Sequence, residues 1–385
     1  MNKIKEWTDK NIQGDPVIWL VVICLSVFGI LVVYSATGSL AYRAGVNTEK
    51  YLLRHAIMVG LSLFVMWVAH KIDYRYYSKL THIALLLSVP LLLYAWLFGS
   101  SINQASRWID LPFIGIQFQP SDLAKLALIA ALATMLAKRQ QKINDFKESL
   151  IPILAWCGGI CALIAMTNIS TAVLLFATCM LLLFIGRVPV KYLAMLMVVG
   201  AFAGLIAMKV GQRGETALSR IESFLHPTEI PYQAKVANMA MASGGVLGNG
   251  PGTSVQRNFL PEAYSDFVFA IIIEEYGLIG GIFVLFLYLV LLYRGMRVVA
   301  NSDRAFGGLL SAGLTFALVI QALVNIGVVV GLGPVTGQTL PLISMGGTSL
   351  LFTGLSLGII LSVSRGEQDD FSAVSGEMKN TIRTA

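Results

Sequence analysis

Ten apolar segments, each about as long as a bilayer-spanning helix, constrain this chain more than any other feature. A transmembrane helix needs about 20 mainly apolar residues, and the segments run near 17–35, 53–69, 82–98, 121–136, 151–167, 169–186, 192–208, 267–291, 307–331 and 341–364. Hydrophobic residues make up 56% of the chain and charged residues only 13%, whereas soluble domains carry about 25% charged residues. The sequence therefore predicts an all-α polytopic membrane protein with about ten transmembrane helices.

Lysine and arginine are distributed unequally between the two sides of this predicted bundle. With a cytoplasmic N-terminus, 18 of the 28 Lys and Arg residues lie on the cytoplasmic side and nine on the outer side, five of these nine in one long loop. Cytoplasmic loops are enriched in positive charge, and long loops follow this rule weakly. We therefore expect a cytoplasmic N-terminus at 1–16, a transmembrane domain at 17–364 and a polar, disordered cytoplasmic tail at 365–385. The net charge of +7 reflects this topology, and no nucleic-acid partner is expected.

The long extracytoplasmic loop at 209–265 joins the predicted seventh and eighth helices. Helical periodicity near 217–225 and 232–242 predicts two short surface or re-entrant helices. A glycine-rich run follows at 243–252. Polar backbone at membrane depth is tolerated only against protein or a wet cavity. We expect the loop to form a flexible lid over such a cavity.

Ionisable residues inside the apolar segments are the first candidates for function, because each is costly in a bilayer. Asp122 and Lys125 have i,i+3 spacing and can pair on one helix face. The pair either anchors the helix end or presents a cation to an anionic substrate. Glu274 and Glu275 are expected to have structural roles.

Asp266 directly precedes the eighth apolar segment. Aspartate is a favoured helix N-cap, and a carboxylate at the outer membrane surface could also act as a general base toward a sugar hydroxyl. The two interpretations are compatible, and spacing alone does not separate them.

Further polar positions flank the apolar segments on the outer side. Arg107 and Trp108 lie in the loop 99–120, where arginine can bind phosphate and tryptophan is typical of a membrane interface. A polar, glycine-rich run at 331–349 indicates either close helix packing or an irregular path into the membrane. The four cysteines and four histidines show no metal-ligand spacing, so we predict packing for the cysteines and no metal site.

These motifs together resemble the SEDS family (shape, elongation, division and sporulation), which includes FtsW, RodA and SpoVE. The resemblance covers about 17–364. Its strongest part is LPEAYSDFVFA at 260–270 with EEYG at 274–277, similar to the family's LPEAxTDFIFA…EExG. Other matches are RW at 107–108, QPSDLAK at 119–125, YQ at 232–233, SGG at 243–245, NI at 325–326, PVTG at 334–337 and LPLISMGG at 340–347.

Two positions depart from the family pattern. Asp122 stands where the family usually has glutamate, so that the carboxylate is one methylene shorter. The family's acidic PDxGT stretch is replaced by TNIST at 167–171, so a role for an acid there is not carried over. The VYSAT stretch at 33–37 favours the FtsW branch, which acts in division, over the RodA branch, which acts in elongation.

The resemblance implies a peptidoglycan glycosyltransferase that polymerises lipid II at the outer face of the cytoplasmic membrane. Asp266 would be the catalytic base. The positions that it implies for substrate binding are Arg107, Asp122, Lys125, Arg220, Gln233, Ser243, Gly244, Asn325, Thr336 and Ser344. A divalent cation (Mg²⁺ or Mn²⁺) could bridge the diphosphate, although no residue cluster identifies its site. The implied partners are a class B penicillin-binding protein transpeptidase and other divisome or elongasome proteins.

Two other functions remain open on the residues alone. A lipid II flippase would also use ionisable residues inside spans, but the paired, interrupted helices of two related halves are not visible. A non-catalytic scaffold for the transpeptidase would not need Asp266. Polymerisation of lipid II by the purified protein, with and without Asp266, is the most informative test: glycan chains would exclude a pure flippase, and the scaffold predicts that loss of Asp266 has no effect.

Overall fold

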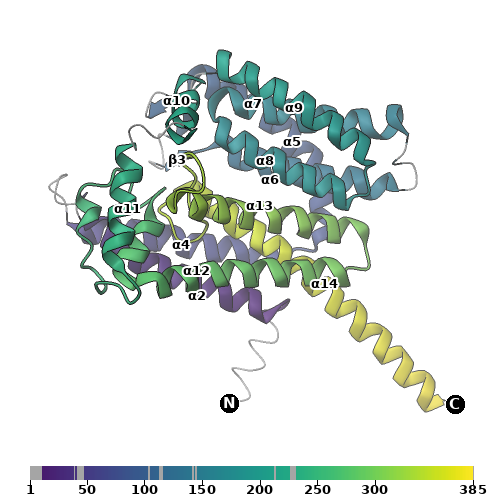
Figure 1. Cartoon of the computed structure of the whole chain (residues 1–385). Helices are drawn as coiled ribbons and strands as arrows, with labels where there is room; N and C mark the ends of the chain where they lie inside the picture. The colour runs from purple at the N-terminus through teal and green to yellow at the C-terminus, as the bar shows by residue number, and fades with distance from the viewer. Residues whose placement is uncertain are drawn as a thin grey trace.

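The computed structural model describes residues 11–38, 40, 47–102, 105–111, 116–140, 143, 145–211, 214–225 and 231–384. Within these ranges the chain is a bundle of long helices (Figure 1). The bundle helices are α2 (Pro16–Ala36), α4 (Thr48–Lys71), α5 (Tyr74–Phe98), α6 (Pro120–Lys138), α7 (Ile151–Thr167), α8 (Ile169–Ile185), α9 (Val190–Val210), α12 (Val268–Asn301), α13 (Ala305–Val329) and α14 (Thr348–Thr384).

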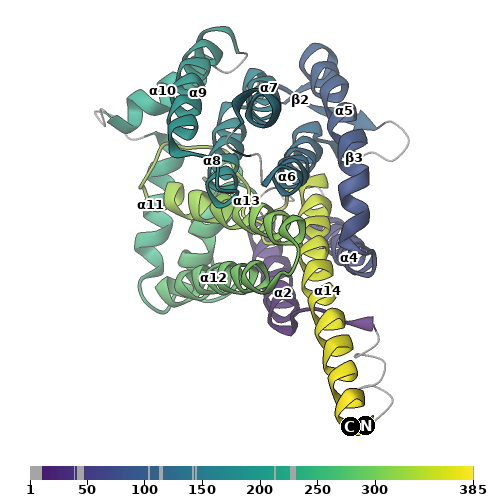
Figure 2. The ribbon, with the colours of Figure 1, turned by 90° about the vertical axis from the view of Figure 1, so that its right-hand side faces the viewer.

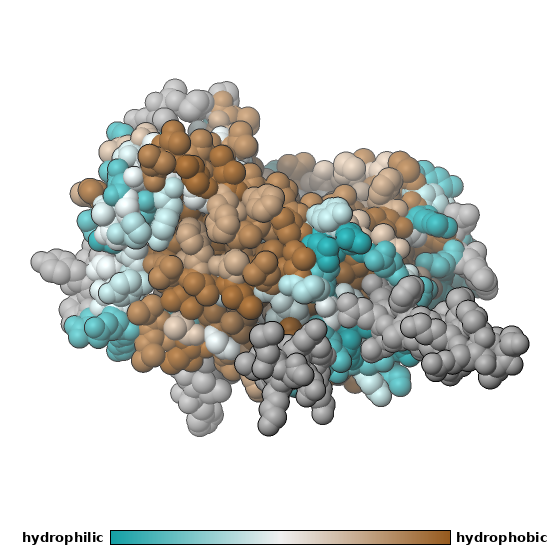
Figure 3. All heavy atoms as spheres, turned by 90° about the horizontal axis from the view of Figure 1, so that it is seen from below, coloured by the Kyte–Doolittle hydropathy of each residue, from teal (hydrophilic) through white to brown (hydrophobic). Residues whose placement is uncertain are grey.

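These helices confirm the predicted polytopic membrane fold. Nine stretches in the described part are long and apolar enough to cross a membrane, and α8 is a shorter apolar helix of 17 residues. Apolar side chains also cover much of the outside. The face in Figure 3 is hydrophobic over its middle and more hydrophilic toward its two ends. A water-soluble bundle would bury these side chains, whereas the bilayer solvates them.

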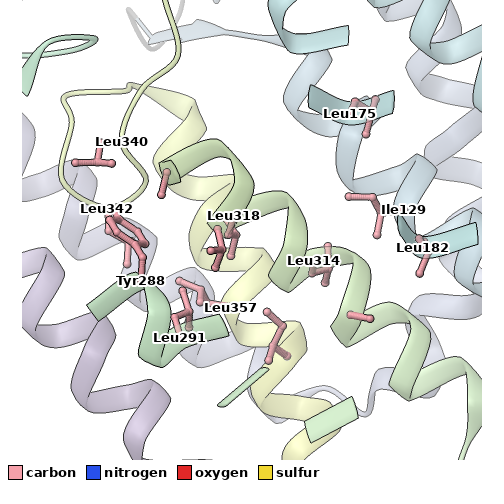
Figure 4. Close-up of a cluster of buried hydrophobic side chains, with 14 of the residues drawn as sticks. Ile129, Leu175, Leu182, Tyr288, Leu291, Leu314, Leu318, Leu340, Leu342 and Leu357 are labelled. Atoms are coloured by element: carbon pink, nitrogen blue, oxygen red, sulfur yellow. The ribbon is translucent and has the colours of Figure 1, made fainter. Parts of the chain in front are cut away.

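Helix α13 lies at the centre of the bundle, where it packs against α6, α8, α12 and α14 (Figure 2). In the close-up of the core, Leu314 of α13 lies near Ile129 of α6 and Leu182 of α8 (Figure 4). All three side chains are buried. Because α13 is enclosed by other helices, polar groups near its C-terminal end are held by neighbouring elements.

Two glycines let α14 approach α4 closely. A Cβ added at Gly354 would lie 2.3 Å from the carbonyl oxygen of Ser62, and one at Gly358 would lie 2.5 Å from that of Met66. The i,i+4 spacing places both glycines on one face, as in small-residue packing motifs of membrane helices. The Ser62 hydroxyl donates to the Leu350 carbonyl at 2.6 Å in the same contact.

The last predicted span begins later in the structure than the sequence indicated, and its apolar part ends near the predicted position, at Gly366. Its start at 341 was expected to be helical, but residues 331–347 form an irregular segment, here called the re-entrant segment, and α14 begins at Thr348. Pro341, Gly346 and Gly347 explain the late start, because proline and glycine disfavour helix interiors. The tail after Arg365, predicted to be disordered, continues α14 to Thr384. This part contains no proline, so a helix nucleated inside the bundle can propagate through it.

A small antiparallel sheet occupies the connection between α5 and α6, where no regular structure was predicted. Its strands are β1 (Ser100–Ile102), β2 (Ala105–Leu111) and β3 (Ile116–Phe118), in the order β1-β2-β3. The start of α14 fixes its edge, because the Thr348 hydroxyl donates to the Gln117 carbonyl at 3.1 Å. The fold remains helical in class, and the sheet covers one end of it.

The long loop contains the two predicted helices, α10 (Gly214–Leu225) and α11 (Tyr232–Gly244), and a short 3-10 helix at Gln256–Asn258. In Figure 1 α10, α11 and β3 gather at one end of the bundle. A further single turn at Phe146–Leu150 leads into α7. The loop is thus largely ordered structure within the described ranges rather than a simple connector.

The glycine-rich run is not the flexible lid that the sequence predicted, because it is bonded to a break in α12. Gly277 interrupts α12 with φ 69° and ψ −172°. Amides and carbonyls released there bind the run, with Asn249 N donating to the Glu274 carbonyl at 3.0 Å and Leu278 N donating to the Gly245 carbonyl at 3.0 Å. A Cβ at Gly277 would lie 2.2 Å from the Val246 oxygen, so only glycine fits this crossing.

Candidate active site

A cavity of about 420 Å³ opens where several helices end on the same side of the bundle. The N-terminal halves of α4, α6 and α8, the C-terminal half of α13, the turn before α12 and the re-entrant segment all contribute to its wall. Its ionisable lining residues are Tyr51, Arg54, His55, Asp122, Lys125, Glu262, Tyr264 and Asp266. This is a small-ligand volume with converging polar groups, which is the usual description of a binding or active site.

Asp266 lies half-buried in this wall, on the turn that leads into α12. The N-cap of α12 is Phe267, so Asp266 is not the helix cap that its spacing allowed. The Ser265 hydroxyl donates to its Oδ1 at 3.0 Å. On the other side, a Cβ added at Gly337 would lie 3.3 Å from Oδ2. The carboxylate is thereby confined at the edge of the cavity.

The backbone at Asp266 is held by the end of α13 and by the re-entrant segment. Asn325 Nδ2 donates to the Asp266 carbonyl at 2.8 Å and to the Gln338 carbonyl at 2.6 Å. The Ser344 hydroxyl donates to the Ser265 carbonyl at 2.6 Å and accepts from Leu340 N at 2.8 Å. Asn325 and Ser344, both implied for substrate binding, are therefore placed as supports of the Asp266 turn.

Asp122 and Lys125 form the predicted ion pair in the first turn of α6, with Lys125 Nζ 2.7 Å from Asp122 Oδ1. The side chain of Asp122 is 4% exposed and that of Lys125 is 23% exposed, and both line the cavity. Asp122 Oδ2 is buried without a hydrogen-bond partner among the described residues. An unpaired carboxylate oxygen at a cavity wall is costly unless a ligand donates to it.

Arg220 of α10 reaches the same region from the long loop. Its guanidinium donates to the Val335 carbonyl at 3.0 Å, two residues before Gly337. Burial lowers the pKa of Arg220, while the negative charge of Asp266 opposes that shift. An arginine titrates so far above neutral pH that it stays charged. Arg220 therefore adds positive potential beside the Asp266 carboxylate.

Tyr264 supplies a neutral donor to the cavity. Burial, followed by the charges of Glu262 and Asp266, raises the pKa of the Tyr264 phenol. Its carbonyl accepts from Met345 N at 3.0 Å, a further contact between the turn and the re-entrant segment. The phenol stays protonated at neutral pH and can donate to a ligand.

Apart from Asp122 and Lys125, the implied substrate-binding positions whose side chains the structure describes do not line this cavity. Gln233, Ser243 and Gly244 lie on α11, where the Ser243 hydroxyl donates to the Ala240 carbonyl at 2.8 Å and a Cβ at Gly244 would lie 2.0 Å from the Ile273 carbonyl oxygen. Their surroundings favour packing of α11 against α12. Thr336 immediately precedes the lining residue Gly337. Arg107 lies in β2, and its side chain is outside the described part of the structure.

Glu274 and Glu275 have the structural surroundings that the sequence favoured. Val255 N and Gln256 N donate to Glu274 Oε1 at 2.9 and 3.2 Å, and the Ser254 hydroxyl donates to Oε2. Glu275 Oε1 accepts from Ser254 N at 3.3 Å and from the Ser35 hydroxyl. Both carboxylates fasten the segment after the glycine-rich run to α12 and α2.

The sequence analysis missed several lining residues, of which His55 is the most informative. Its side chain is 1% exposed, and neither ring nitrogen has a hydrogen-bond partner among the described residues. Arg54, Gln321 and Gln338 also line the cavity. The rule that selected Asp122, a polar group inside an apolar span, applies equally to His55 and would have found it.

The cavity does not assemble a protein-based cation site. Within the described ranges, the one group of three or more potential metal ligands in mutual reach is Cys157, Cys161 and Cys179, which lies elsewhere. Asp122 is already paired with Lys125, whose positive charge opposes binding of a cation. The donor set here therefore does not fit a resident divalent ion.

The chain is similar in sequence over most of its length to proteins of known description. A sequence model for a family described as "Cell cycle protein" matches residues 15–369. A "Probable peptidoglycan glycosyltransferase FtsW" of Geobacter metallireducens is 36% identical over 355 residues, which cover 91% of this chain and 94% of the relative. Stage V sporulation protein E of Bacillus subtilis is 32% identical over 369 residues, covering 93% and 99%.

The fold is similar to solved structures as well. A chain from a structure titled "Structural coordination of polymerization and crosslinking by a peptidoglycan synthase complex" aligns with a TM-score of 0.71 and 26% identity, covering 92% of this chain and 98% of that one. The rod shape determining protein RodA of Thermus thermophilus aligns with a TM-score of 0.68 and 27% identity, covering 92% and 97%. The helix arrangement thus occurs in solved structures.

Proposed function

Because the chain belongs to the FtsW/RodA/SpoVE family of cell cycle proteins, we propose that it polymerises lipid II as a peptidoglycan glycosyltransferase with Asp266 as its catalytic base. The single observation that carries the residue assignment is the position of Asp266. It is half-buried, braced through its backbone by Asn325, and faces a cavity that also contains a lysine. General bases need such an oriented and partly desolvated carboxylate.

The proposed reaction is the one that the family resemblance implies, with Asp266 in the role of the base. The 4-hydroxyl of the acceptor sugar attacks the anomeric carbon of a glycan carried on undecaprenyl pyrophosphate. The new carbon–oxygen bond forms as the bond to pyrophosphate breaks, and Asp266 takes the hydroxyl proton. The electron pair leaves on the pyrophosphate, whose low basicity makes a strong acid unnecessary. Attack opposite the leaving group inverts the anomeric configuration.

Lys125 is the cation best placed for the diphosphate. It lines the cavity at the outer end of α6, and its pairing with Asp122 holds its position. Preorganised charges stabilise developing negative charge in the transition state. Arg220 and Arg107 would add to this potential. A divalent cation would have to arrive with the diphosphate, and no step depends on it.

A small, mainly apolar crevice adjoins the polar cavity and would contact the first part of the lipid. A second cavity of about 50 Å³ shares Asp122, Lys125 and Gln321 with the first. Its wall continues between α6, α8, α13 and α14, and its apolar lining includes Leu126, Ile129, Leu174, Leu314, Leu318 and Phe352. A lipid-linked sugar needs this juxtaposition of polar and apolar surfaces.

The proposed cellular setting is the cytoplasmic membrane, with both termini inside and the cavity facing outward. The proposed partner is a class B penicillin-binding protein. One structural neighbour comes from a complex whose title joins polymerisation to crosslinking. Division is favoured over elongation because curated relatives carry the name FtsW.

Purified protein supplied with lipid II in detergent tests the proposal. Wild type should form glycan chains, and Asp266→Asn should lower the rate by about 100-fold or more, the scale of general base catalysis. Asp303→Asn is the matched control, because Asp303 is an exposed aspartate between α12 and α13. Thermal unfolding should show both variants folded.

The outcomes separate the three candidate functions. Glycan chains made by the pure protein exclude a flippase without polymerase activity. Polymerisation by Asp266→Asn near the wild-type rate would refute the base assignment. A wild-type protein that makes no chains, alone or with the transpeptidase, would exclude the polymerase, and movement of lipid II across a vesicle membrane by that protein would then favour the flippase over the scaffold.

A further inference from the structure

Three cysteines that do not line either cavity form a buried cluster between α7 and α8. Cys157 and Cys161 lie one turn apart on α7, and Cys179 faces them from α8. Their sulfur atoms all lie within 4.8 Å of one another, and the residues are 0%, 7% and 0% exposed. The fourth cysteine, Cys24 on α2, is half-buried and outside this group.

The surroundings of this thiol cluster determine which ligand it can take. All three cysteines belong to the hydrophobic core, and the sequence of 151–185, which covers both helices, contains no Lys, Arg, Asp or Glu. A bound ion must replace the thiol protons, because thiolates are the ligating form. Three thiolates carry a charge of −3, and an uncompensated charge in an apolar interior is strongly unfavourable.

Charge balance then separates the thiophilic ions. A monovalent copper ion would leave the cluster at −2 and a divalent zinc ion at −1. A trivalent ion leaves it neutral. With all three thiolates bonded, a trivalent ion leaves the site neutral, whereas a monovalent or divalent ion leaves a buried charge.

We propose that Cys157, Cys161 and Cys179 form a binding site for a trivalent thiophilic metalloid of the arsenite class. Neutral arsenous acid reacts with three thiols to give three arsenic–sulfur bonds and three molecules of water. The three arsenic–oxygen bonds break, each hydroxide takes one thiol proton, and no oxidant or reductant is required. Both reactant and product are neutral, which suits entry into and retention by an apolar site.

The geometry requires only a small adjustment. Three sulfurs bonded to one central atom at about 2.3 Å, the length of a zinc–thiolate bond, lie at most about 4 Å apart. A pair of thiols at the observed limit of 4.8 Å therefore closes by at least about 0.8 Å. Side-chain rotation at Cys157 and Cys161 is sufficient, and the bound ion would join α7 to α8. Thr171, on the outer turn of α8, lines the large cavity, so the joined helices include part of the catalytic wall.

Arsenite itself is the probe, used with the full chain in detergent. After removal of free arsenite by desalting, wild type and Cys24→Ser should each retain one arsenic per chain. Arsenic-edge X-ray absorption should show sulfur neighbours only. Cys161→Ala and Cys179→Ala should each weaken retention by more than about 100-fold, since even outer-shell substitutions at metal sites cost about 10–100-fold.

Several results would overturn the site. These are no retained arsenic in wild type, dependence on Cys24, oxygen neighbours around arsenic, or undiminished binding by either alanine variant that elutes as a folded protein.

Zinc tests whether the charge of the bound ion determines the choice of ligand. Zinc binding releases protons to the solvent, whereas arsenite binding releases water, so retention of arsenite should not change between pH 6.5 and 8. Preferential retention of zinc in a competition would refute the choice of ion.

Discussion

His55 is a side chain whose burial lowers the stability of the fold while it places a polar group at the cavity. Its two ring nitrogens are buried without a partner among the described residues, at the wall of the large cavity. An unsatisfied buried polar group costs about 1–3 kcal/mol. A cost of this size is retained when the group acts on a ligand.

Replacement of His55 by leucine should therefore raise stability and lower activity. His55→Leu is expected to increase the free energy of unfolding by about 1–3 kcal/mol, because it removes unpaired polar atoms. Polymerisation should fall, mainly through a higher KM for lipid II. Thermal unfolding and initial rates measure the two effects. His82→Leu is the control, since His82 is exposed on α5. A His55 variant with unchanged rates would make the residue a packing group.

At the residue scale, the sequence predicted the charged residues of the site better than the residues that support them. Asp122, Lys125 and Asp266 follow from their positions in or beside apolar spans, and the structure brings them to one cavity. Gln233, Ser243 and Gly244 belong to motifs equally visible in the sequence, but they lie on α11 away from the cavity. Sequence motifs do not distinguish residues that contact substrate from residues that pack helices, because both are tightly constrained.

At the element scale, the break in α12 depends on two carboxylates. Glu274 receives donors from Ser254, Val255 and Gln256, and these contacts fasten the loop after the glycine-rich run. Hydrogen bonds to charged groups contribute about 1.5–3 kcal/mol each. The loop geometry therefore rests on a carboxylate inside the helix bundle rather than on the glycines alone.

Glu274→Ala should release this loop. We expect a loss of about 3 kcal/mol or more, because two backbone donors lose a charged acceptor. Limited proteolysis should then cut within 245–258, where wild type resists. Glu215→Ala is the matched control, as Glu215 is exposed on α10. Equal resistance of Glu274→Ala and wild type would contradict the proposed role of the carboxylate.

The close contact between α4 and α14 leads to a second prediction at the element scale, which concerns the stability of the helix packing. Gly354→Val should prevent close packing, because its Cβ would lie 2.3 Å from the Ser62 oxygen. The expected result is a much lower yield of folded protein and a lower melting temperature. Gly158→Ala should instead stabilise α7 by about 1 kcal/mol, since a Cβ there meets no atom within 4 Å. A valine variant that melts like wild type would refute the packing argument.

The sequence predicted the helices well and their connections poorly. Apolar length is sufficient to define a span, because the bilayer imposes it. The re-entrant segment was read as helix because 341–364 is apolar, although tertiary hydrogen bonds from Asn325 and Ser344 hold it in irregular form. The sheet at 100–118 was missed because three short strands give a weak periodic signal.

At the scale of the whole molecule, the cavity and the long loop share one end of the bundle. The charge distribution predicts that this end faces outward. Single cysteines test the orientation: Ser219→Cys on α10 should react with a membrane-impermeant maleimide in spheroplasts. Asp303→Cys should react only after the membrane is disrupted. Both positions are exposed. The opposite labelling pattern would place the cavity in the cytoplasm and remove its access to exported lipid II.

The bracing of Asp266 also has a consequence for biosynthesis. Its supports, Asn325 and Ser344, follow in the chain at separations of 59 residues from Asp266 and 79 residues from Ser265. A ribosome that has just delivered α12 has thus produced the carboxylate without the groups that align it. The chain can become catalytically active only after α13 and α14 have been inserted. A stalled or prematurely terminated chain would insert into the membrane but remain inactive, so it could not start glycan synthesis before the protein is complete.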